Sequence, residues 1–329
     1  MLVNKDNFFE ALDAVILVII TLLIFLSFPI NIIFVMINIV IMNFVGIYGS
    51  NPKRYRDIIF SCVIVSSSAI IGNYFNQYQA LAAIIVIIYG GLSFYLPKFK
   101  GIFNAAALNS GALMFLIYTS MQYQLKNTIS YIIGSCLILV LFLVYYLIRK
   151  KFTKSTQKEN QKITVSNEAY YSMTILAVIS LTIAYFLNRI ITCYYPLSNS
   201  YWIALTILVV IQNTYKKTVV ICLKRISVNL LGAVIAVICF IYIFPDSVYF
   251  DLVFLILIMF CIFLFGSSYT LRVIFIEIFI LGLALFTSHF QISTGVERVL
   301  DTIIGGVILL VVTIVYMYIL NKFKEKTLS

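Results

Sequence analysis

A few charged side chains inside long apolar segments are the residues of this chain that could do chemistry. Glu277 follows Arg272 by five residues within an apolar run, and Asp13 lies within the first apolar run. A carboxylate in an apolar environment is costly, so each should face other helices or water. We predict that Glu277 and Asp13 bind protons. The alternatives are a structural ion pair of Glu277 with Arg272 or Arg225, and an ion pair or interfacial position for Asp13.

A candidate anion site follows from the stretch SYWIALTILVVIQNTYKKTVVICLKRISVNLLGA, residues 200–233. Arg225, Asn229 and Gly232 lie at i, i+4 and i+7, which places them on one face of a helix. A guanidinium can bind a carboxylate through two parallel hydrogen bonds. We predict that Arg225 binds an anion, with Gln212 and Asn229 beside it. The alternative is that Arg225 only anchors its helix at the membrane surface.

Four more residues have predicted positions. Trp202, the only tryptophan, should begin a helix at the outer membrane interface, and it is a candidate for lining a transport path. Asn109 is a candidate for the same role, with a hydrogen bond between helices as the alternative. Arg298 and Asp301 are expected to cap the last apolar helix, because an Asp near a helix N-terminus complements the helix dipole.

Twelve apolar segments must position these residues. Hydrophobic residues make up 63% of the chain and charged residues 11%, which excludes an ordinary soluble domain. Segments of this length can cross a hydrocarbon core of about 30 Å, so we predict an all-α polytopic membrane protein. The expected spans are 8–27, 30–48, 58–75, 79–96, 102–121, 128–148, 169–189, 198–214, 222–244, 249–266, 272–290 and 299–320.

The basic residues predict how these spans are oriented. With a cytoplasmic N-terminus, 20 of the 23 Lys and Arg residues fall on the inner side. This asymmetry follows the positive-inside rule and accounts for the net charge of +11 without nucleic acid. We therefore predict a protein of the cytoplasmic membrane, in contact with membrane lipids, with both termini inside. The six cysteines and one histidine form no metal-ligand pattern, and we expect no metal and no cofactor.

A polar segment divides the spans into two groups of six. The halves share short patterns in the same order, such as Ile-Ile-Gly followed by Val-Tyr, and Asn109 aligns with Glu277. With six spans in each half, the repeats are parallel and related by an axis along the membrane normal, an arrangement that often holds a transport path between repeats. The predicted parts are a first six-helix repeat at 1–148, a basic cytoplasmic linker at 149–168, a second six-helix repeat at 169–321 and a basic cytoplasmic tail at 322–329.

The stretch YWIALTILVVIQ, a basic turn and then KRISVNLLGA resemble the signature of the FUSC (fusaric acid resistance) and aromatic acid exporter families. In those families a helix that begins with Tyr-Trp and ends with Gln precedes an Arg-x-x-Gly-Thr-x-x-Gly helix. ERVLDTIIGG, residues 297–306, is similar to their Arg-x-x-Asp-Thr-x-x-Gly motif. The resemblance covers residues 170–320. It departs from the family pattern where Asn213, Val228 and Asn229 replace Pro, Gly and Thr.

This resemblance implies export of aromatic or other organic acids. With the charged residues above, it predicts a transporter that exports small organic anions, with aromatic carboxylic acids as the substrate class and an ion gradient as the driving force. We expect no enzymatic activity, since the chain has neither a P-loop nor an Asp-rich diphosphate motif. The alternatives are a passive anion channel and a non-transporting envelope scaffold whose basic linker binds a partner or anionic lipid. Homo-oligomerisation stays open.

Overall fold

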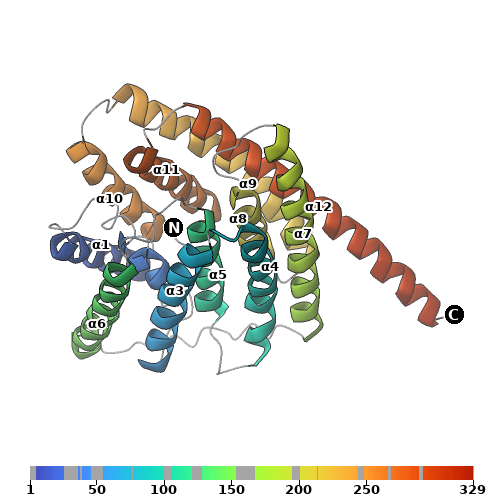
Figure 1. The fold of residues 1–329 in the computed structure, drawn as a ribbon, viewed down its shortest axis with the longest axis horizontal. Helices are drawn as coiled ribbons and strands as arrows, with labels where there is room; N and C mark the ends of the chain where they lie inside the picture. Colours follow the sequence, from blue (N-terminus) through green and yellow to red (C-terminus); the bar gives the residue numbers. More distant parts are fainter. Residues whose placement is uncertain are drawn as a thin grey trace. The chain divides into compact units, whose positions relative to one another are not determined.

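The computed structural model of the chain is helical throughout its described part (Figure 1). No strand occurs within that part, so the all-α prediction is confirmed. The structure describes residues 5–25, 36–37, 39–45, 55–75, 77–99, 105–120, 128–152, 167–194, 201–212, 214–243, 248–265, 268–288 and 292–328.

Each of the predicted apolar segments contains helical residues. Residues 36–37 and 39–45 are helical within the second segment. The other helices are α1 (Lys5–Phe25), α3 (Tyr55–Phe75), α4 (Gln79–Tyr95), α5 (Ala105–Ser120), α6 (Thr128–Phe152), α7 (Asn167–Tyr194), α8 (Tyr201–Val210), α9 (Tyr215–Val237), α10 (Val248–Leu264), α11 (Tyr269–Ser288) and α12 (Ile292–Leu328). A short 3-10 helix, η1 (Leu96–Lys98), follows α4, and a π-helix, η3 (Ile238–Ile243), continues α9.

Helix length and composition support a multi-pass membrane protein. Among the described residues, five helical segments are long and apolar enough to cross a membrane, and further apolar helices are shorter. α8 has 10 residues, so it is about 15 Å long, half of a hydrocarbon core of about 30 Å. The predicted number of twelve spans therefore stays a prediction. The five segments are Ile58–Phe75, Gln79–Lys98, Asn167–Ile191, Tyr215–Phe240 and Gly295–Lys322.

The side chains of α12 are distributed as expected for a helix in lipid. Its buried face carries polar and charged residues, namely Arg298, Asp301, Thr302 and Thr313. Its exposed apolar residues recur every three or four positions. They are Val296, Leu300, Ile303, Val307, Val311, Ile314 and Tyr318, with Val315 and Ile319 beside the last two. A helix on the surface of a water-soluble protein has the reverse arrangement, with its apolar stripe facing the core.

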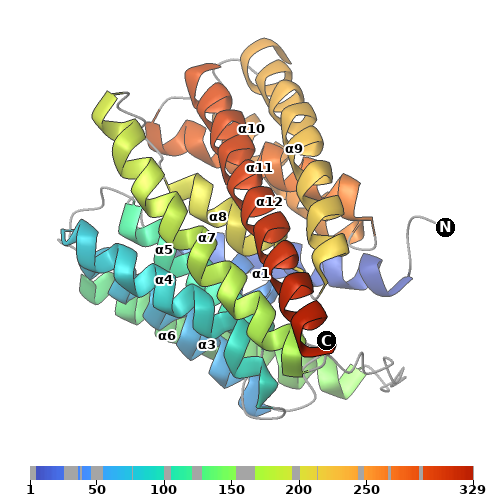
Figure 2. The ribbon, with the colours of Figure 1, turned by 90° about the vertical axis from the view of Figure 1, so that its right-hand side faces the viewer.

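Contacts divide the chain into two compact units. Unit 1 comprises Met1–Ile20 and Thr182–Ser329, and unit 2 comprises Thr21–Leu181. In unit 1, α9 packs against α11 and α12, α10 packs against α11, and α12 packs against α8. Figure 2 shows α9 and α12 side by side. In unit 2, α3 packs against α5 and α6, and α4 packs against α5.

The same neighbours recur in both halves, as the predicted repeat requires. In each unit the third helix of the half packs against the fifth and sixth, and the fourth against the fifth. A glycine of the third helix also meets the fifth helix at two residues that are three apart. These contacts are Gly232 with the Ile274 carbonyl and Glu277 Cβ, and Gly72 with the Phe115 carbonyl and Tyr118 Cβ. This register aligns Tyr118 with Glu277, in disagreement with the predicted partner Asn109. The repeat itself stays a prediction.

Helices extend into the predicted linker and tail. α6 continues to Phe152 and α7 begins at Asn167, so both linker boundaries fall inside helices, while 153–166 lies outside the described residues. α12 continues to Leu328 through the predicted tail. Lys, Glu and Leu are good helix formers, so a helix that leaves an apolar segment can continue through NKFKEKTL.

Candidate functional site

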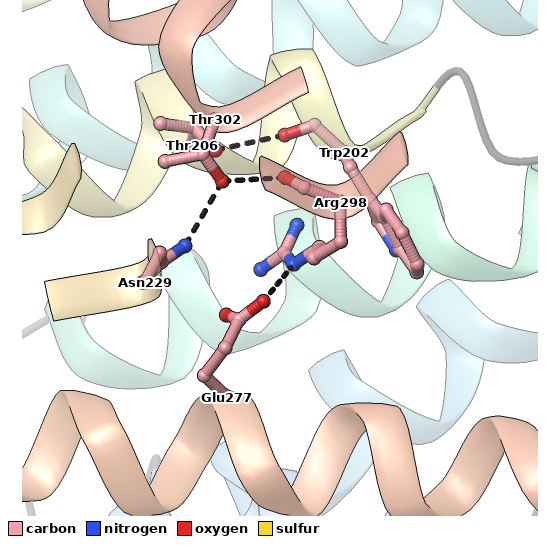
Figure 3. A network of polar contacts seen from close by, with 6 residues as sticks. All are labelled: Trp202, Thr206, Asn229, Glu277, Arg298 and Thr302. Carbon is pink, nitrogen blue, oxygen red and sulfur yellow. Dashed lines mark hydrogen bonds and ion pairs between the residues drawn. The ribbon is translucent and has the colours of Figure 1, made fainter. Parts of the chain in front are cut away.

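A buried cluster of charged residues in unit 1 is centred on Arg298 of α12. Its Nε donates a hydrogen bond to Oε1 of Glu277 on α11 at 3.1 Å, and both side chains are 0% exposed. Figure 3 shows the Arg298 side chain extending toward Glu277. Taking two charges out of water is costly, and a single hydrogen bond between them offsets only part of that cost. An ion pair this deep in an apolar bundle therefore invites a functional explanation.

Trp202 of α8 covers the same guanidinium. The central carbon of the Arg298 guanidinium lies 4.8 Å from the centroid of the indole ring, within the range of a cation–π contact. Trp202 is 2% exposed, so its ring packs inside the unit. Its predicted place at the outer membrane interface stays a prediction. One turn later, Thr206 donates a hydrogen bond to the Trp202 carbonyl at 2.9 Å. α8 thus supplies an aromatic wall to the cluster.

An amide and a hydroxyl join α9 to α12 beside this pair. Asn229 Nδ2 donates to Thr302 Oγ1 at 2.9 Å, and Thr302 Oγ1 donates to the Arg298 carbonyl at 2.9 Å (Figure 3). Both side chains are buried. The two bonds hold α9 against the turn of α12 that carries Arg298. The sequence analysis placed Asn229 beside Arg225, and the structure also links it to the helix of Arg298.

Glycines allow these helices to approach closely enough for the contacts. A Cβ atom on Gly232 would lie 2.8 Å from Glu277 Cβ, and one on Gly305 would lie 2.7 Å from the Ile203 carbonyl oxygen. Contacts under 3.0 Å are not tolerated without movement of the neighbour, and a backbone carbonyl moves only with its helix. Small residues at these positions therefore set the spacing of α9 from α11 and of α12 from α8.

Arg225 brings a second buried guanidinium to the cluster. It lies on the buried face of α9 with Asn229, and it is 2% exposed. Glu277 and Arg298 both interact with it electrostatically, and the Tyr269 hydroxyl lies beside it. The start of α9 is held by Thr214, whose side chain accepts a hydrogen bond from the Lys217 backbone N–H. The N-cap therefore sets the helical phase that turns Arg225 inward.

Several polar atoms of the charged side chains in the cluster have no hydrogen-bond partner. Within the described part of the chain, this holds for both Nη atoms of Arg298, Nε of Arg225, Oε2 of Glu277 and both carboxylate oxygens of Asp301. Asp301 is 0% exposed and lies three residues after Arg298 on the same helix. Two cations and two carboxylates sum to zero charge, but among these four described residues a single ion pair is formed, that of Arg298 with Glu277. The cluster thus contains guanidinium donors and carboxylate acceptors that could bind a further polar group.

Two sequence predictions about this region are wrong. Arg298 and Asp301 do not cap α12, which begins at Ile292 and has no acidic residue in its first turn. The ion pair of Glu277 is with Arg298, and neither Arg272 nor Arg225 is its hydrogen-bonded partner. Both errors come from taking the last apolar span to begin at 299, whereas α12 begins a full two turns earlier and carries Arg298 into the interior.

Three further candidates were predicted from the sequence, namely Gln212, Asp13 and Asn109. Gln212 follows α8 in the turn before α9, where its backbone N–H donates to Thr218 Oγ1 at 3.0 Å. Asp13 is buried on α1 in unit 1, and Asn109 is half-buried on α5 in unit 2. Their roles stay predictions.

One motif contained the signal for the residues that the sequence analysis misjudged. In ERVLDTIIGG, Arg298, Asp301, Thr302 and Gly305 follow a spacing of three, four and seven, so they share one helical face. That face is the buried one. Tyr269 carried no comparable signal, because it is one of 23 tyrosines and lies at the start of an apolar helix.

Comparison with known proteins finds a family match within the second half of the chain. Residues 179–312 match the family model described as fusaric acid resistance protein-like. The matched segment contains the whole cluster, from Trp202 to Thr302, and it agrees with the resemblance found in the sequence motifs. No curated protein and no solved structure shows significant similarity to the chain. Among the described residues, no group of His, Cys, Asp and Glu is arranged to hold a metal ion.

Proposed function

We propose that this chain, whose residues 179–312 belong to the fusaric acid resistance protein-like family, exports small organic anions through a site at Arg298. The family points to a membrane transport or efflux role, and the apolar helices agree with it. The substrate class that we propose is the aromatic carboxylic acids, and the proposed location is the cytoplasmic membrane with both termini inside.

The observation that carries this proposal is the unpartnered guanidinium edge of Arg298. Its Nε is held by Glu277, while both Nη atoms lack a partner among the described residues although the side chain is fully buried. Buried N–H donors that lack a partner cost free energy, and a carboxylate is the acceptor that a guanidinium binds best. Arg225 adds positive charge, and the Trp202 ring adds an aromatic surface next to the carboxylate position.

The test is benzoate binding to the purified full chain, measured by isothermal titration calorimetry. Arg298→Gln should weaken binding by about 10- to 150-fold, since one charge-assisted hydrogen bond contributes about 1.5–3 kcal/mol. Arg189→Gln is the matched control, because Arg189 is exposed on α7 of the same unit, and it should bind as the wild type does. The double variant Arg298→Gln with Glu277→Gln leaves no unpaired carboxylate at position 277 and should fold without binding benzoate.

Wild-type affinity in the folded double variant would refute the site. Export is tested separately, by comparing the organic acids released by cells with and without the protein. Equal release would favour the envelope scaffold over a transporter. Flux that depends only on the concentration gradient of the anion, and does not change with the gradient of any other ion, would favour the passive channel.

A further inference from the structure

We propose that Asp301 binds one proton together with each anion, so that proton and anion cross the membrane in the same direction. The inference rests on the proposed function and deepens it by naming the coupled ion and its carrier. Its basis is the charge count of the buried cluster and the lack of hydrogen-bond partners at Asp301.

The four fully buried ionisable side chains of the cluster are balanced without a substrate. Arg225 and Arg298 carry two positive charges, and Glu277 and Asp301 carry two negative charges when ionised. An organic anion at the Nη atoms of Arg298 adds a third negative charge. An uncompensated charge in a low-dielectric interior is strongly disfavoured. One proton taken up with the anion restores neutrality.

Asp301 is the group best placed to take that proton. Glu277 already accepts the Arg298 Nε–H through Oε1, so protonating it would weaken the ion pair between α11 and α12. Neither oxygen of Asp301 has a hydrogen-bond partner among the described residues, so a proton there breaks no hydrogen bond. Arg298 lies one helical turn away on α12 and interacts electrostatically with Asp301, so anion and proton sites are adjacent.

Other ionisable groups near Asp301 do not take over this role. Those that interact with the cluster are Glu297 and Arg298 on α12, Cys222 and Arg225 on α9, and Tyr269 and Glu277 on α11. α8 contributes no charged side chain over residues 202–210. Cys222 donates its thiol hydrogen to the Gly306 carbonyl. Glu297 is only half-buried and interacts electrostatically with Asp301, so it is the carboxylate that the control variant below removes.

The proton step involves a single bond. As the anion binds, a proton from the same side of the membrane forms an O–H bond with one Asp301 oxygen. When the anion leaves on the other side, that bond breaks and the proton leaves with it. The transported charge is zero, so the membrane potential does not drive the step. Net outward flux requires that the product of anion and proton concentrations be higher inside.

The test measures protons taken up when benzoate binds to the purified full chain in weakly buffered detergent solution, followed with a pH-sensitive dye at about pH 6 to 9. Benzoate stays ionised there, because a carboxylic acid titrates near pH 4. The wild type should take up as much as about one proton per benzoate, and its affinity should fall by up to about tenfold per pH unit as the pH rises. Asp301→Asn should bind benzoate with no proton uptake and with an affinity independent of pH.

Glu297→Gln is the matched control, since it removes a carboxylate four residues away on the same helix, and it should keep the wild-type uptake. Proton release by the wild type, or full uptake by Asp301→Asn, would overturn the inference while leaving the anion site in place. The sign of the wild-type signal decides this even if Asp301→Asn does not fold. If the wild type binds no benzoate, the proposed function itself fails.

Discussion

Removing the charge of either Arg298 or Glu277 alone should strongly destabilise the protein, and removing both charges together should cost less than the sum of the two single changes. At 3.1 Å and an effective dielectric constant of about 20, two unit charges attract by about 5 kcal/mol. Breaking a buried pair by removing one partner costs about 3–5 kcal/mol, because the other charge stays buried without compensation. We expect each single change to Gln to fall in that range.

The geometry limits how large the coupling can be. One of the three guanidinium nitrogens bonds to Glu277, so the pair has one charge-assisted hydrogen bond, which contributes about 1.5–3 kcal/mol. The double variant removes both charges, so neither charge is left buried without its partner. The coupling free energy from the wild type, the two single variants and the double variant should therefore be about 1.5–3 kcal/mol.

Unfolding by SDS in mixed micelles, followed by fluorescence and far-ultraviolet circular dichroism, measures this cycle. Trp202 is the only tryptophan and lies against Arg298, so its emission reports on the site itself. Circular dichroism shows whether the whole chain unfolds in the same transition. If the two single changes were additive within about 0.5 kcal/mol, the pair would have no energetic role and our account of the cluster would be refuted.

Two further predictions concern packing and orientation. Gly305→Ala should destabilise the protein by about 1–3 kcal/mol in the same SDS assay, because the new Cβ would lie 2.7 Å from the Ile203 carbonyl oxygen. Gly295→Ala is its control, with the nearest atom at 3.6 Å, and it should be neutral or slightly stabilising; equal effects would show that helix spacing is not set at Gly305. In intact cells, Lys158→Cys should resist an impermeant thiol reagent and Lys126→Cys should react, and labelling of position 158 from outside would invert the orientation. Both of these positions lie outside the described residues.

The cluster also changes which residues matter for transport. The sequence analysis placed the anion at Arg225 and left Arg298 at a helix end. In the structure the two arginines share one carboxylate environment, with Arg298 hydrogen-bonded to Glu277 and Arg225 interacting with both electrostatically. Variants of Arg225 therefore test the electrostatic interaction with Glu277 and Arg298. Variants of Arg298 test the hydrogen bond to Glu277 and the proposed anion site.

Composition and periodicity were sufficient to identify this chain as a helical membrane protein and to locate its apolar segments. They also placed Arg225, Asn229 and Gly232 on one face, which is the buried face of α9. The reason is that hydrophobicity and the 3.6-residue period act within a single helix. The motif match in the second half rested on the same kind of local information, and the family comparison bears it out.

Contacts between helices required the tertiary structure. Periodicity does not determine which neighbouring helix a buried face contacts, or the register of that contact. Glu277 had three arginines within reach of an ion pair, and only the packing of α9 between α11 and α12 decides that its partner is Arg298. The same holds for Trp202, whose ring lies over that guanidinium, and for Gly72 and Gly232, whose contacts align Tyr118 with Glu277. These relations depend on the register between helices, which is set by close packing at small residues and not by the apolar pattern of any one segment.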